Sequence, residues 1–496
     1  MNHQINRLLN FALQQGLIRK SDACYCANRL LAVLQLDGYV PENVDEVLDT
    51  PDDIMAEMLD YAEKKGIIEG TANQRDLFDT AIMDCVMPRP SEVIADFEAN
   101  YAQSPEKATD RYYAMSIASN YIRKKRIEKN VVWQTSTEYG DLDITINLSK
   151  PEKDPRDIAR AKLAKSSSYP KCLLCRENEG FAGHATHPAR QTHRLIPLDF
   201  HGHSWFLQYS PYTYYNEHCI ILNSEHVPMK ISRTTFENLT EFVTIFPHYF
   251  AGSNADLPIV GGSILSHDHY QGGRYTFAMA KAPVEREYSF PKYPDVQAGR
   301  VKWPMSALRL TSTNCKQLID LAEHILTLWR GYSDESVGIL AESAGEPHNT
   351  VTPICRRVGE AYQLDLVLRN NRTDAANPLG IFHPHANVHH IKKENIGLIE
   401  VMGLAVLPPR LKENMALIRE ALLTGRNSVA DDERLAMHAD WYVQIRKAHP
   451  EINTENAEEI IKDEIGKVFM QVLTDAGVFK RNTQGLEAFD KFVATI

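Results

Sequence analysis

Apolar residues recur at helical spacing through most of the first 139 residues. The period is clearest in four stretches, residues 5–13, 29–36, 54–62 and 114–122. Side chains three and four positions apart share one face of a helix, so this spacing predicts amphipathic helices. The pattern therefore indicates a helical N-terminal extension over residues 1–139.

The pattern changes to strict alternation at Gly140. Leu142, Ile144 and Ile146 point one way along residues 140–149, while Asp143 and Thr145 point the other. A period of two predicts a half-buried strand. A charged linker with two prolines, residues 150–157, follows it.

Two regions rich in strands and turns follow the linker. The first, at about residues 170–288, includes strand patterns at 205–209 and 218–222 and a helix at 234–246. The second follows a helix at 316–329 and includes a strand at 362–368. These patterns predict an α+β protein with two antiparallel-sheet halves flanked by helices. Its predicted domains are 1–139, 140–290, 291–430 and a helical tail, 431–496.

Composition and charge exclude several classes of protein. The formal net charge of −11 leaves no overall basic field for nucleic acid or an anionic membrane. One basic run, residues 123–126, is interpreted as a solvated helix face. The longest apolar stretch, residues 398–407, is half of the roughly 20 residues that a membrane-spanning helix needs. No signal core follows the N-terminus, so we expect a cytoplasmic protein.

Eight cysteines are scattered along the chain, which in a reducing compartment favours thiols or metal ligands over disulfides. Only Cys172 and Cys175 have an informative spacing. Two thiolates three positions apart can clamp a zinc ion if two further ligands converge on it. Reduced, metal-free thiols are the alternative interpretation.

An H-x-H-x-Q pattern framed by glycine pairs spans residues 261–273. We interpret it as a strand followed by a tight turn, with His267, His269 and Gln271 facing a common space. A bare H-x-H is equally compatible with a structural or solvent-facing pair. His226 ends a strand pattern at a turn that would present its imidazole, although it could be an ordinary histidine.

The order of these motifs resembles that of the galactose-1-phosphate uridylyltransferases, which belong to the histidine-triad superfamily. In that family C-x-x-C is followed by a strand ending in S-E-H and then by H-x-H-x-Q. The helical extension and the sequences of residues 266–273 and 383–400 resemble those of the second, Gram-positive family. This resemblance covers the whole chain. The resemblance implies two histidine-triad-like sheet halves and a cytoplasmic homodimer.

The activity that this resemblance implies is nucleotidyl transfer in galactose (Leloir) metabolism. UDP-glucose and galactose 1-phosphate would become glucose 1-phosphate and UDP-galactose. His269 matches the histidine that is uridylylated, and a neutral imidazole is a competent nucleophile toward phosphorus. Gln271 matches a glutamine that hydrogen-bonds the transferred phosphoryl group. It cannot titrate, which favours transfer over hydrolysis.

The resemblance also implies metal sites but no organic cofactor. Four residues match the ligands of a closed, structural zinc site: Cys172, Cys175, His226 and His267. Four others match a second, iron-type site of some relatives: Glu285, His348, His383 and His385. That region is simply rich in histidine, so the second set has an ordinary alternative.

Substrate contacts are implied at seven further positions. Those matching nucleotide contacts are Asp199, Asn254, Gly262 and Ser263. Those matching sugar-phosphate contacts are Lys392, Lys393 and Glu400. Asp256 is an alternative to Asn254, Asp199 could instead be a turn residue, and the two lysines could be surface residues. Asp268 stands where the first family usually has proline, and we assign it no catalytic role.

Two other interpretations remain open from the residues. A nucleotide-sugar or dinucleoside-polyphosphate phosphorylase would use the same histidine with inorganic phosphate as acceptor. A zinc-bound interaction module without catalysis would explain the metal ligands, but neither Gln271 nor the glycine frame.

Overall fold

The computed structural model describes residues 1–149, 168–262, 264–425 and 429–496. The predicted linker 150–157 and Ser263 lie outside these residues. The chain divides into two compact units. The first comprises residues 1–129, 149–227 and 267–269, and the second comprises 130–148, 228–266 and 270–496. Cutting the chain into the four domains named above remains a prediction.

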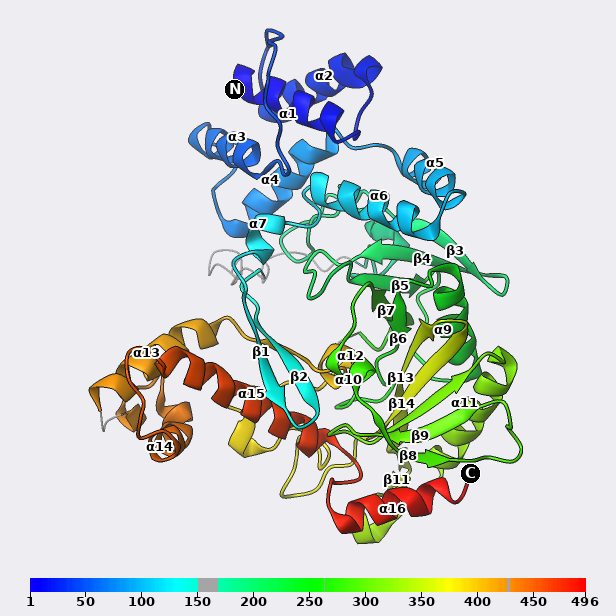
Figure 1. The fold of residues 1–496 in the computed structure, drawn as a ribbon. Coiled ribbons are helices and arrows are strands. Elements are labelled where there is room, and N and C mark those ends of the chain that lie inside the picture. The colour runs from blue at the N-terminus through cyan, green and yellow to red at the C-terminus, as the bar shows by residue number, and fades with distance from the viewer. Residues whose placement is uncertain (150–167, 263, 426–428) are drawn as a thin grey trace. The chain divides into compact units, whose positions relative to one another are not determined.

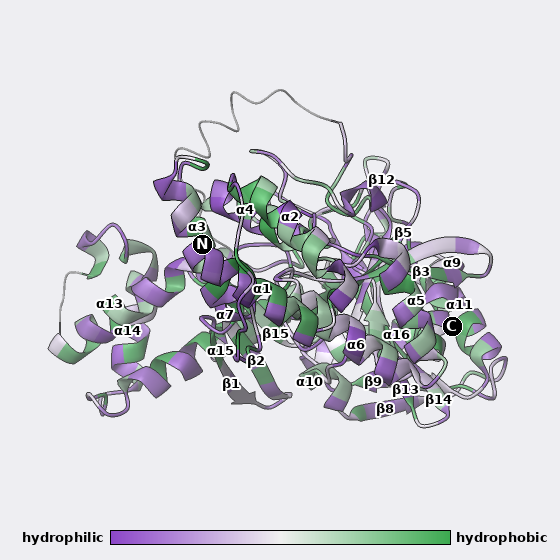
Figure 2. Cartoon of the chain, turned by 90° about the horizontal axis from the view of Figure 1, so that it is seen from above, coloured by the Kyte–Doolittle hydropathy of each residue, from purple (hydrophilic) through white to green (hydrophobic). Residues whose placement is uncertain are grey.

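Helices make up the N-terminal part of the first unit, as the apolar period predicts. They are α1 (Asn2–Gln14), α2 (Ala23–Leu34), α3 (Asp52–Lys64), α4 (Ala72–Asp84), α5 (Pro90–Tyr101), α6 (Pro105–Ala118) and α7 (Lys124–Ile127). Green apolar and purple polar residues intermingle along α1, α2 and α4 (Figure 2). The apolar residues are buried, with Leu8, Leu30 and Met58 fully inaccessible.

Capping residues explain where two of these helices, α6 and α4, begin. The Ser104 hydroxyl accepts a hydrogen bond from the Lys107 amide at 3.1 Å, and Pro105 occupies the first turn of α6, where its missing N–H costs nothing. Thr71 caps α4 in the same way.

The basic run at residues 123–126 is not simply a solvated face. Arg123 donates to Asp76 at 3.0 Å and pairs with Asp79 at 3.2 Å, while Arg126 also binds Asp76. Both carboxylates belong to α4, and Asp79 is almost completely buried. Lys125 also pairs with Asp53 of α3 at 2.6 Å, so three of the run's four cations link helices within the unit.

The first unit also contains a three-stranded antiparallel arrangement in the order β3-β4-β5. Its strands are β3 (Ile196–Phe200), β4 (His203–Tyr209) and β5 (Cys219–Asn223), so the strand patterns at 205–209 and 218–222 are confirmed. Leu207, Tyr209 and Ile221 are inaccessible to solvent. The 3₁₀ turn η2 (Arg176–Asn178) precedes these strands.

A small sheet of the second unit corrects the expected end of the helical extension. β1 (Val131–Thr137) pairs antiparallel with β2 (Gly140–Ile146), and β15 (Leu404–Leu407) pairs parallel with β2. The helical interpretation of residues 131–137 is wrong because β-branched Val131 and Val132 and aromatic Trp133 favour a strand.

The alternation in β2 is confirmed on its apolar face only. Leu142, Ile144 and Ile146 are buried as predicted, but Thr145 and Asn147 are buried too. The opposite face is covered because α10 (Ala278–Lys281) packs on β2 and Tyr275 donates a hydrogen bond to Asp143 at 2.8 Å. This strand is therefore more than half-buried.

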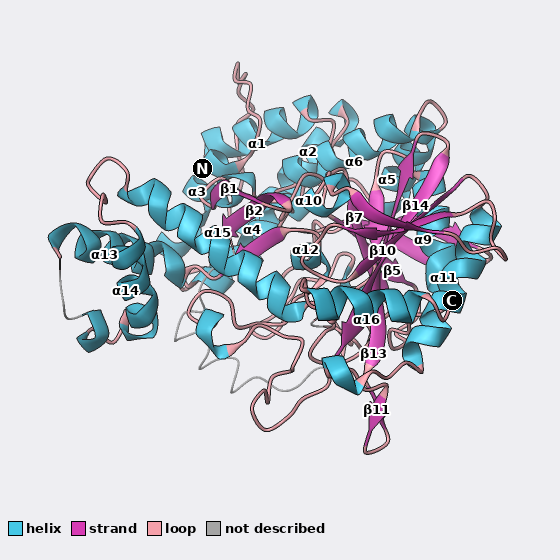
Figure 3. Cartoon of the chain, turned by 60° about the horizontal axis from the view of Figure 1, so that its bottom comes forward, coloured by secondary structure: helices cyan, strands magenta, loops and turns pink. Residues whose placement is uncertain are grey.

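A larger antiparallel arrangement in the second unit has the order β7-β6-β13-β14-β10-β9-β8. Its strands are β6 (Phe250–Gly252), β7 (His269–Gly273), β8 (Val284–Tyr288), β9 (Gln297–Val301), β10 (Ala307–Ser312), β13 (Asn349–Val358) and β14 (Ala361–Asn370). Helices α9 (Arg233–Ile245) and α11 (Cys315–Arg330) pack on β13, and α11 also packs on β10 and β14 (Figure 3). The α+β class is thereby confirmed.

Most remaining elements of this unit are helical. They are α12 (Leu398–Val401), α13 (Arg410–Thr424), α14 (Ala439–Ala448), α15 (Ala457–Ala476) and α16 (Thr483–Val493), with a short hairpin of β11 (Glu342–Ser343) and β12 (Glu346–Pro347). The apolar stretch at 398–407 forms α12 and β15. Among the described residues no helix is long and apolar enough to cross a membrane.

A buried ion-pair group ties the strands of the second unit together. Asp365 on β14 is inaccessible and accepts hydrogen bonds from Arg309 at 2.7 and 2.9 Å and from Arg356 at 2.7 Å. Burial would raise the pKa of Asp365, but the two guanidinium groups outweigh it and keep that pKa below its ordinary value. Arg309 also donates to the carbonyls of Met279 and Ala282, fixing α10.

Replacing Asp365→Ala should lower the free energy of unfolding by about 3–5 kcal/mol, because it leaves two buried guanidinium groups without a carboxylate. Urea denaturation measures the loss. The matched control is Lys316→Ala, which removes an exposed i,i+4 pair with Asp320 and should cost less than about 1 kcal/mol. Equal losses in the two variants would contradict this account of the core.

Candidate active site and metal centre

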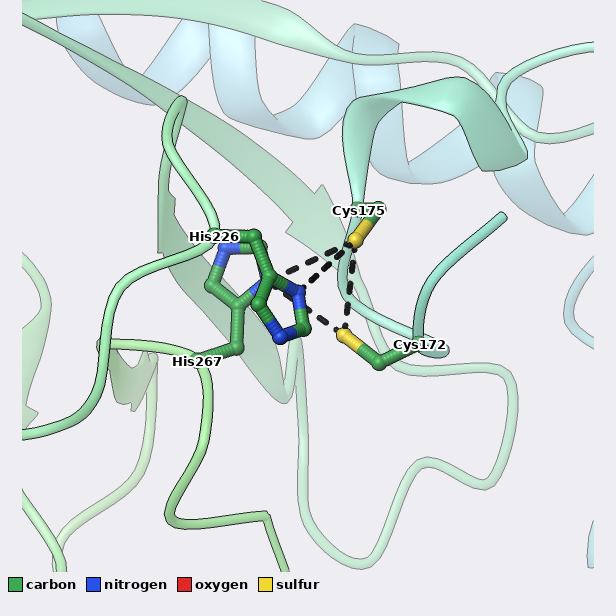
Figure 4. A group of neighbouring side chains, drawn as sticks. All are labelled: Cys172, Cys175, His226 and His267. Carbon is green, nitrogen blue, oxygen red and sulfur yellow. Dashed lines mark hydrogen bonds between the residues drawn. The ribbon is translucent and has the colours of Figure 1, made fainter. Parts of the chain in front are cut away.

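Four side chains of the first unit converge at one point, and Figure 4 shows them pointing toward one another. The Cys172 and Cys175 sulfurs are 3.6 Å apart, and Nδ1 of His267 lies 3.3 and 3.7 Å from them. Nδ1 of His226 lies 3.2 Å from the Cys175 sulfur. All four donor atoms lie within 4.8 Å of one another, so this group could hold a metal ion.

These separations fit a tetrahedral ion. Zinc bonds of about 2.3 Å to sulfur and about 2.0 Å to nitrogen imply ligand separations of roughly 3.8 Å between two sulfurs and roughly 3.5 Å between sulfur and nitrogen. The observed 3.6 Å and 3.2–3.7 Å are close to these values. Burial raises the pKa of the Cys175 thiol to about 11, so a cation at this point would be needed to keep it a thiolate.

A buried asparagine that our sequence reasoning missed holds the two cysteines in place. Asn178 is inaccessible, and its Nδ2 donates to the carbonyls of Cys172 at 2.9 Å and Cys175 at 2.8 Å. Its Oδ1 accepts from Nε2 of His187 at 2.6 Å. The C-x-x-C segment is thus clamped by a side chain three residues further on. That spacing, C-x-x-C-x-x-N, was the available signal.

His267 is oriented by the end of β5. Its Nε2 donates to the carbonyl of Asn223 at 2.9 Å, which turns Nδ1 toward the cysteines. Next to it, the Asn223 amide donates to the Asp268 carbonyl and the Asp268 amide donates to the Val227 carbonyl. These bonds use the backbone of Asp268, and the absence of a catalytic role for its carboxylate stays a prediction.

The predicted order of strand then turn around His267 is wrong. The chain bends at residues 266–267, and the strand β7 begins only at His269. The Asn223 carbonyl could have accepted a hydrogen bond from a neighbouring strand, but it accepts one from the His267 imidazole instead. Two glycines precede the bend, and a Cβ on Gly261 would lie 2.5 Å from the Ala255 carbonyl oxygen.

His269 is buried, and its Nδ1 lies 2.8 Å from the His267 carbonyl oxygen. A carbonyl can only accept, so Nδ1 carries the proton and Nε2 has the free lone pair. Burial lowers the pKa of His269 to about 4, which keeps the ring neutral near pH 7. Gln271 follows two residues later on β7, opposite Gly252 on β6, and is half-buried.

Four of the expected substrate contacts lie side by side in the second unit. A Cβ on Gly262 would lie 2.6 Å from Nδ2 of Asn254, and Oδ1 of Asn254 accepts from the Leu398 amide at 2.8 Å. Glu400 accepts from the Gly397 amide at 3.2 Å and from Nζ of Lys392 at 2.9 Å. The alternative to Asn254 has another role, since Asp256 bonds Ile231, Thr350 and Arg330.

The remaining substrate candidates are more dispersed. Asp199 is exposed and accepts from the Gly202 amide at 2.9 Å, so it closes the β3–β4 turn. Lys393 is exposed and lines a cavity of about 610 Å³ beside α14 and α15, apart from buried Lys392. Their contacts with substrate stay predictions.

The second predicted metal set has other partners. Glu285 binds Arg300 and Arg481, each at 2.7 Å. His348 bonds Ser343 and Asn371, whereas His383 and His385 bond backbone carbonyls at 3.2 and 3.0 Å. Among the described residues only the Cys172 group brings three or more donors together. The second metal stays a prediction that would require rearrangement of these side chains.

Comparison with known families matches both halves of the chain. The model for the N-terminal domain of galactose-1-phosphate uridyl transferase matches residues 16–228, and that for its C-terminal domain matches residues 241–443. The chain belongs to the galactose-1-phosphate uridylyltransferase family. Its recognition from three ordered motifs is confirmed.

Curated relatives agree over the full length. A galactose-1-phosphate uridylyltransferase of Clostridium acetobutylicum is 63% identical over 99% of both chains. One from Halalkalibacterium halodurans is 53% identical over 99% of this chain and 98% of the relative. Among solved structures, yeast Ap4A phosphorylase Apa2 is 10% identical with a TM-score of 0.35, covering 66% of this chain and 92% of that chain.

Asn178→Ala should weaken zinc retention by about 10–100-fold, the usual effect of removing a residue that orients metal ligands. The rate of zinc transfer to a colorimetric chelator measures this, together with zinc per chain by mass spectrometry. Asn28→Ala, which removes an exposed asparagine of the same unit, serves as control. Unchanged zinc release in Asn178→Ala would show that the clamp does not position the cysteines.

Proposed function

We propose that this protein is a UDP-glucose–hexose-1-phosphate uridylyltransferase that works through a uridylyl-histidine at His269. Membership of the family and the full-length likeness to enzymes of that name support the reaction. The observation that carries the mechanism is the state of His269, whose ring is neutral and whose Nε2 is free because Nδ1 donates to the His267 carbonyl.

The reaction proceeds in two displacements. Nε2 of His269 attacks the α-phosphorus of UDP-glucose, a P–N bond forms, and the P–O bond to glucose 1-phosphate breaks. A phosphate oxygen of galactose 1-phosphate then attacks the same phosphorus, which releases the imidazole and yields UDP-galactose. Neither leaving group needs a proton, because one is a phosphate and the other a neutral imidazole.

Gln271 takes the place of a titrating group beside the nucleophile. Its amide can donate hydrogen bonds to the transferred phosphoryl group but cannot accept or release a proton at neutral pH. Water is therefore not activated by this residue, and the uridylyl group persists until a sugar phosphate arrives. This supports transfer rather than hydrolysis.

A zinc ion would be held by Cys172, Cys175, His226 and His267. In such a closed site the ion supplies rigidity and not Lewis-acid chemistry, since no coordination position is left for substrate. The protein's own contribution is the short connection from His267 to His269. Holding the His267 ring in place also holds the His267 carbonyl, which orients the His269 ring.

Substrate recognition is assigned to Asp199, Asn254, Gly262, Ser263, Lys392, Lys393 and Glu400. The adjacency of Asn254 and Gly262 supports a nucleotide-phosphate role, because backbone can approach a ligand closely there. Lys392 is paired with Glu400, so it would act on a sugar phosphate together with that carboxylate. A cytoplasmic homodimer is the assembly expected for the family.

Intact-mass spectrometry after exposure to UDP-glucose should show one uridylyl adduct per chain in the parent and none in His269→Ala. Gln271→Ala should form the adduct at least about 100-fold more slowly if its hydrogen bonds are specific to the transition state. His385→Ala, which removes a histidine of the C-terminal half instead, should retain the adduct. An adduct in His269→Ala would exclude the proposed nucleophile.

The same adduct distinguishes the possible acceptors. Galactose 1-phosphate should discharge it with release of UDP-galactose, whereas inorganic phosphate should not. Discharge by phosphate to UDP would instead identify a phosphorylase.

Adduct formation should change less than about twofold between pH 7.5 and 5.5. Because the pKa of His269 is lowered to about 4, the ring stays neutral over this range, whereas a histidine with the usual value of about 6.5 would be about 90% protonated at pH 5.5 and react about tenfold more slowly. Single-turnover mass spectrometry gives the rate, with zinc content checked at each pH. A tenfold fall at constant zinc would contradict the lowered pKa.

A further inference from the structure

The helical extension contains a cavity that is lined by none of the residues proposed for uridylyl transfer. It has a volume of about 680 Å³, and its lining residues lie between Gly16 and Met115, in the segment after α1, in α2, α5 and α6, and in the segment after α4. These helices are the dark blue to cyan elements of the first unit in Figure 1. Small-molecule sites usually have about 300–1,000 Å³, so the cavity is large enough for a nucleotide.

Four arginines line the cavity, and two of them make contacts that hold the protein together. Arg111 donates to the carbonyls of Gln15 and Gly16 at 3.1 Å, and Arg29 pairs with Asp84 at 2.7 Å, so both are structural. Arg19 and Arg89 also line the cavity, and within the described chain neither guanidinium forms an ion pair. Two exposed lining cations are thus available to an anionic ligand.

Two carboxylates near these arginines in the sequence accept hydrogen bonds from backbone amides. Asp22 accepts from the amide of Arg19 at 3.2 Å, and Glu92 accepts from the amide of Arg89 at 2.9 Å. Each carboxylate has further lone pairs that can accept from hydroxyl groups. The rim therefore offers donors for an anion and acceptors for a sugar.

The inner wall is apolar. Cys26, Val93, Phe97, Ala108 and Met115 line it, and each is more than nine-tenths buried. Tyr25, on the rim, is 62% exposed and presents an aromatic surface. A wall of this kind suits a flat heterocyclic base rather than a second hydroxylated sugar.

We propose that this cavity is a second, non-catalytic binding site for a nucleotide. Its phosphate is held by Arg19 and Arg89, its ribose by Asp22 and Glu92, and its base by the apolar wall. Arginine forms bidentate hydrogen bonds to phosphate, which the guanidinium groups of Arg19 and Arg89 can provide. None of the residues proposed for uridylyl transfer or its substrates lines this cavity.

Equilibrium dialysis of the full-length, zinc-loaded His269→Ala protein tests this proposal. This background binds UDP-sugar ligands without becoming uridylylated. Radiolabelled UMP and AMP are the probes, and inorganic phosphate is the third ligand. We expect UMP to reach two per chain, or AMP to bind one per chain without competing with UDP-glucose. Phosphate should bind far more weakly, because it cannot use the apolar wall.

Arginine variants test whether the additional nucleotide binds in this cavity. Arg19→Ala/Arg89→Ala should weaken it by about 100-fold, as two charge-assisted contacts are lost, while the site that UDP-glucose occupies is unchanged. Arg19→Lys/Arg89→Lys should recover part of the affinity. The matched control, Lys20→Ala/Lys64→Ala, removes two exposed cations of the same unit that do not line the cavity and should change neither site.

Three outcomes would overturn the proposal. They are a UMP stoichiometry of one with no independent AMP binding, equal loss in the lysine control, and phosphate binding as tightly as the nucleotides. None of them bears on whether His269 forms a uridylyl adduct, so failure here leaves the proposed reaction intact.

Discussion

The hydrogen bond from Nδ1 of His269 to the His267 carbonyl decides what this site can do. This bond is 2.8 Å long, places the ring proton on Nδ1 and leaves Nε2 with its lone pair. Burial then removes the competing protonated state by lowering the pKa of His269 to about 4. A neutral imidazole in one tautomer thus results from a backbone hydrogen bond together with burial.

That geometry depends on how the preceding histidine is held. His267 is fixed from two sides, by the Asn223 carbonyl on Nε2 and by the cysteine sulfurs near Nδ1. Asn178 in turn holds the two cysteine carbonyls, and His187 holds Asn178. The cysteine–histidine group and His269 are thus joined by a short chain of directional bonds within one compact unit. Under the proposed mechanism, a zinc ion held there would help to position the nucleophile.

Buried charged side chains also organise part of the second unit. Lys392 is paired with Glu400. Arg369 is only 1% exposed and donates to the Ile396 carbonyl, and burial lowers its pKa to about 10. Glu400 and Asn254 accept hydrogen bonds from the amides of Gly397 and Leu398, so contacts within the protein hold this loop. The sequence did not suggest Arg369.

The sequence by itself determined the helices of the extension, the α+β class and the family. Those features follow from local periods and from motif order, and such information is contained in neighbouring residues. Only the tertiary structure decided that residues 131–137 form a strand, that His267 lies in a bend and that Asn178 clamps the cysteines. It also decided that Asp199 closes a turn and that Lys392 is paired rather than free. His267 bonds the Asn223 carbonyl, 44 residues away. The cysteine partners of Asn178, the turn partner of Asp199 and the carboxylate partner of Lys392 are within eight residues. In both cases these hydrogen bonds and charges compete with local preference, and they form only when the chain is folded.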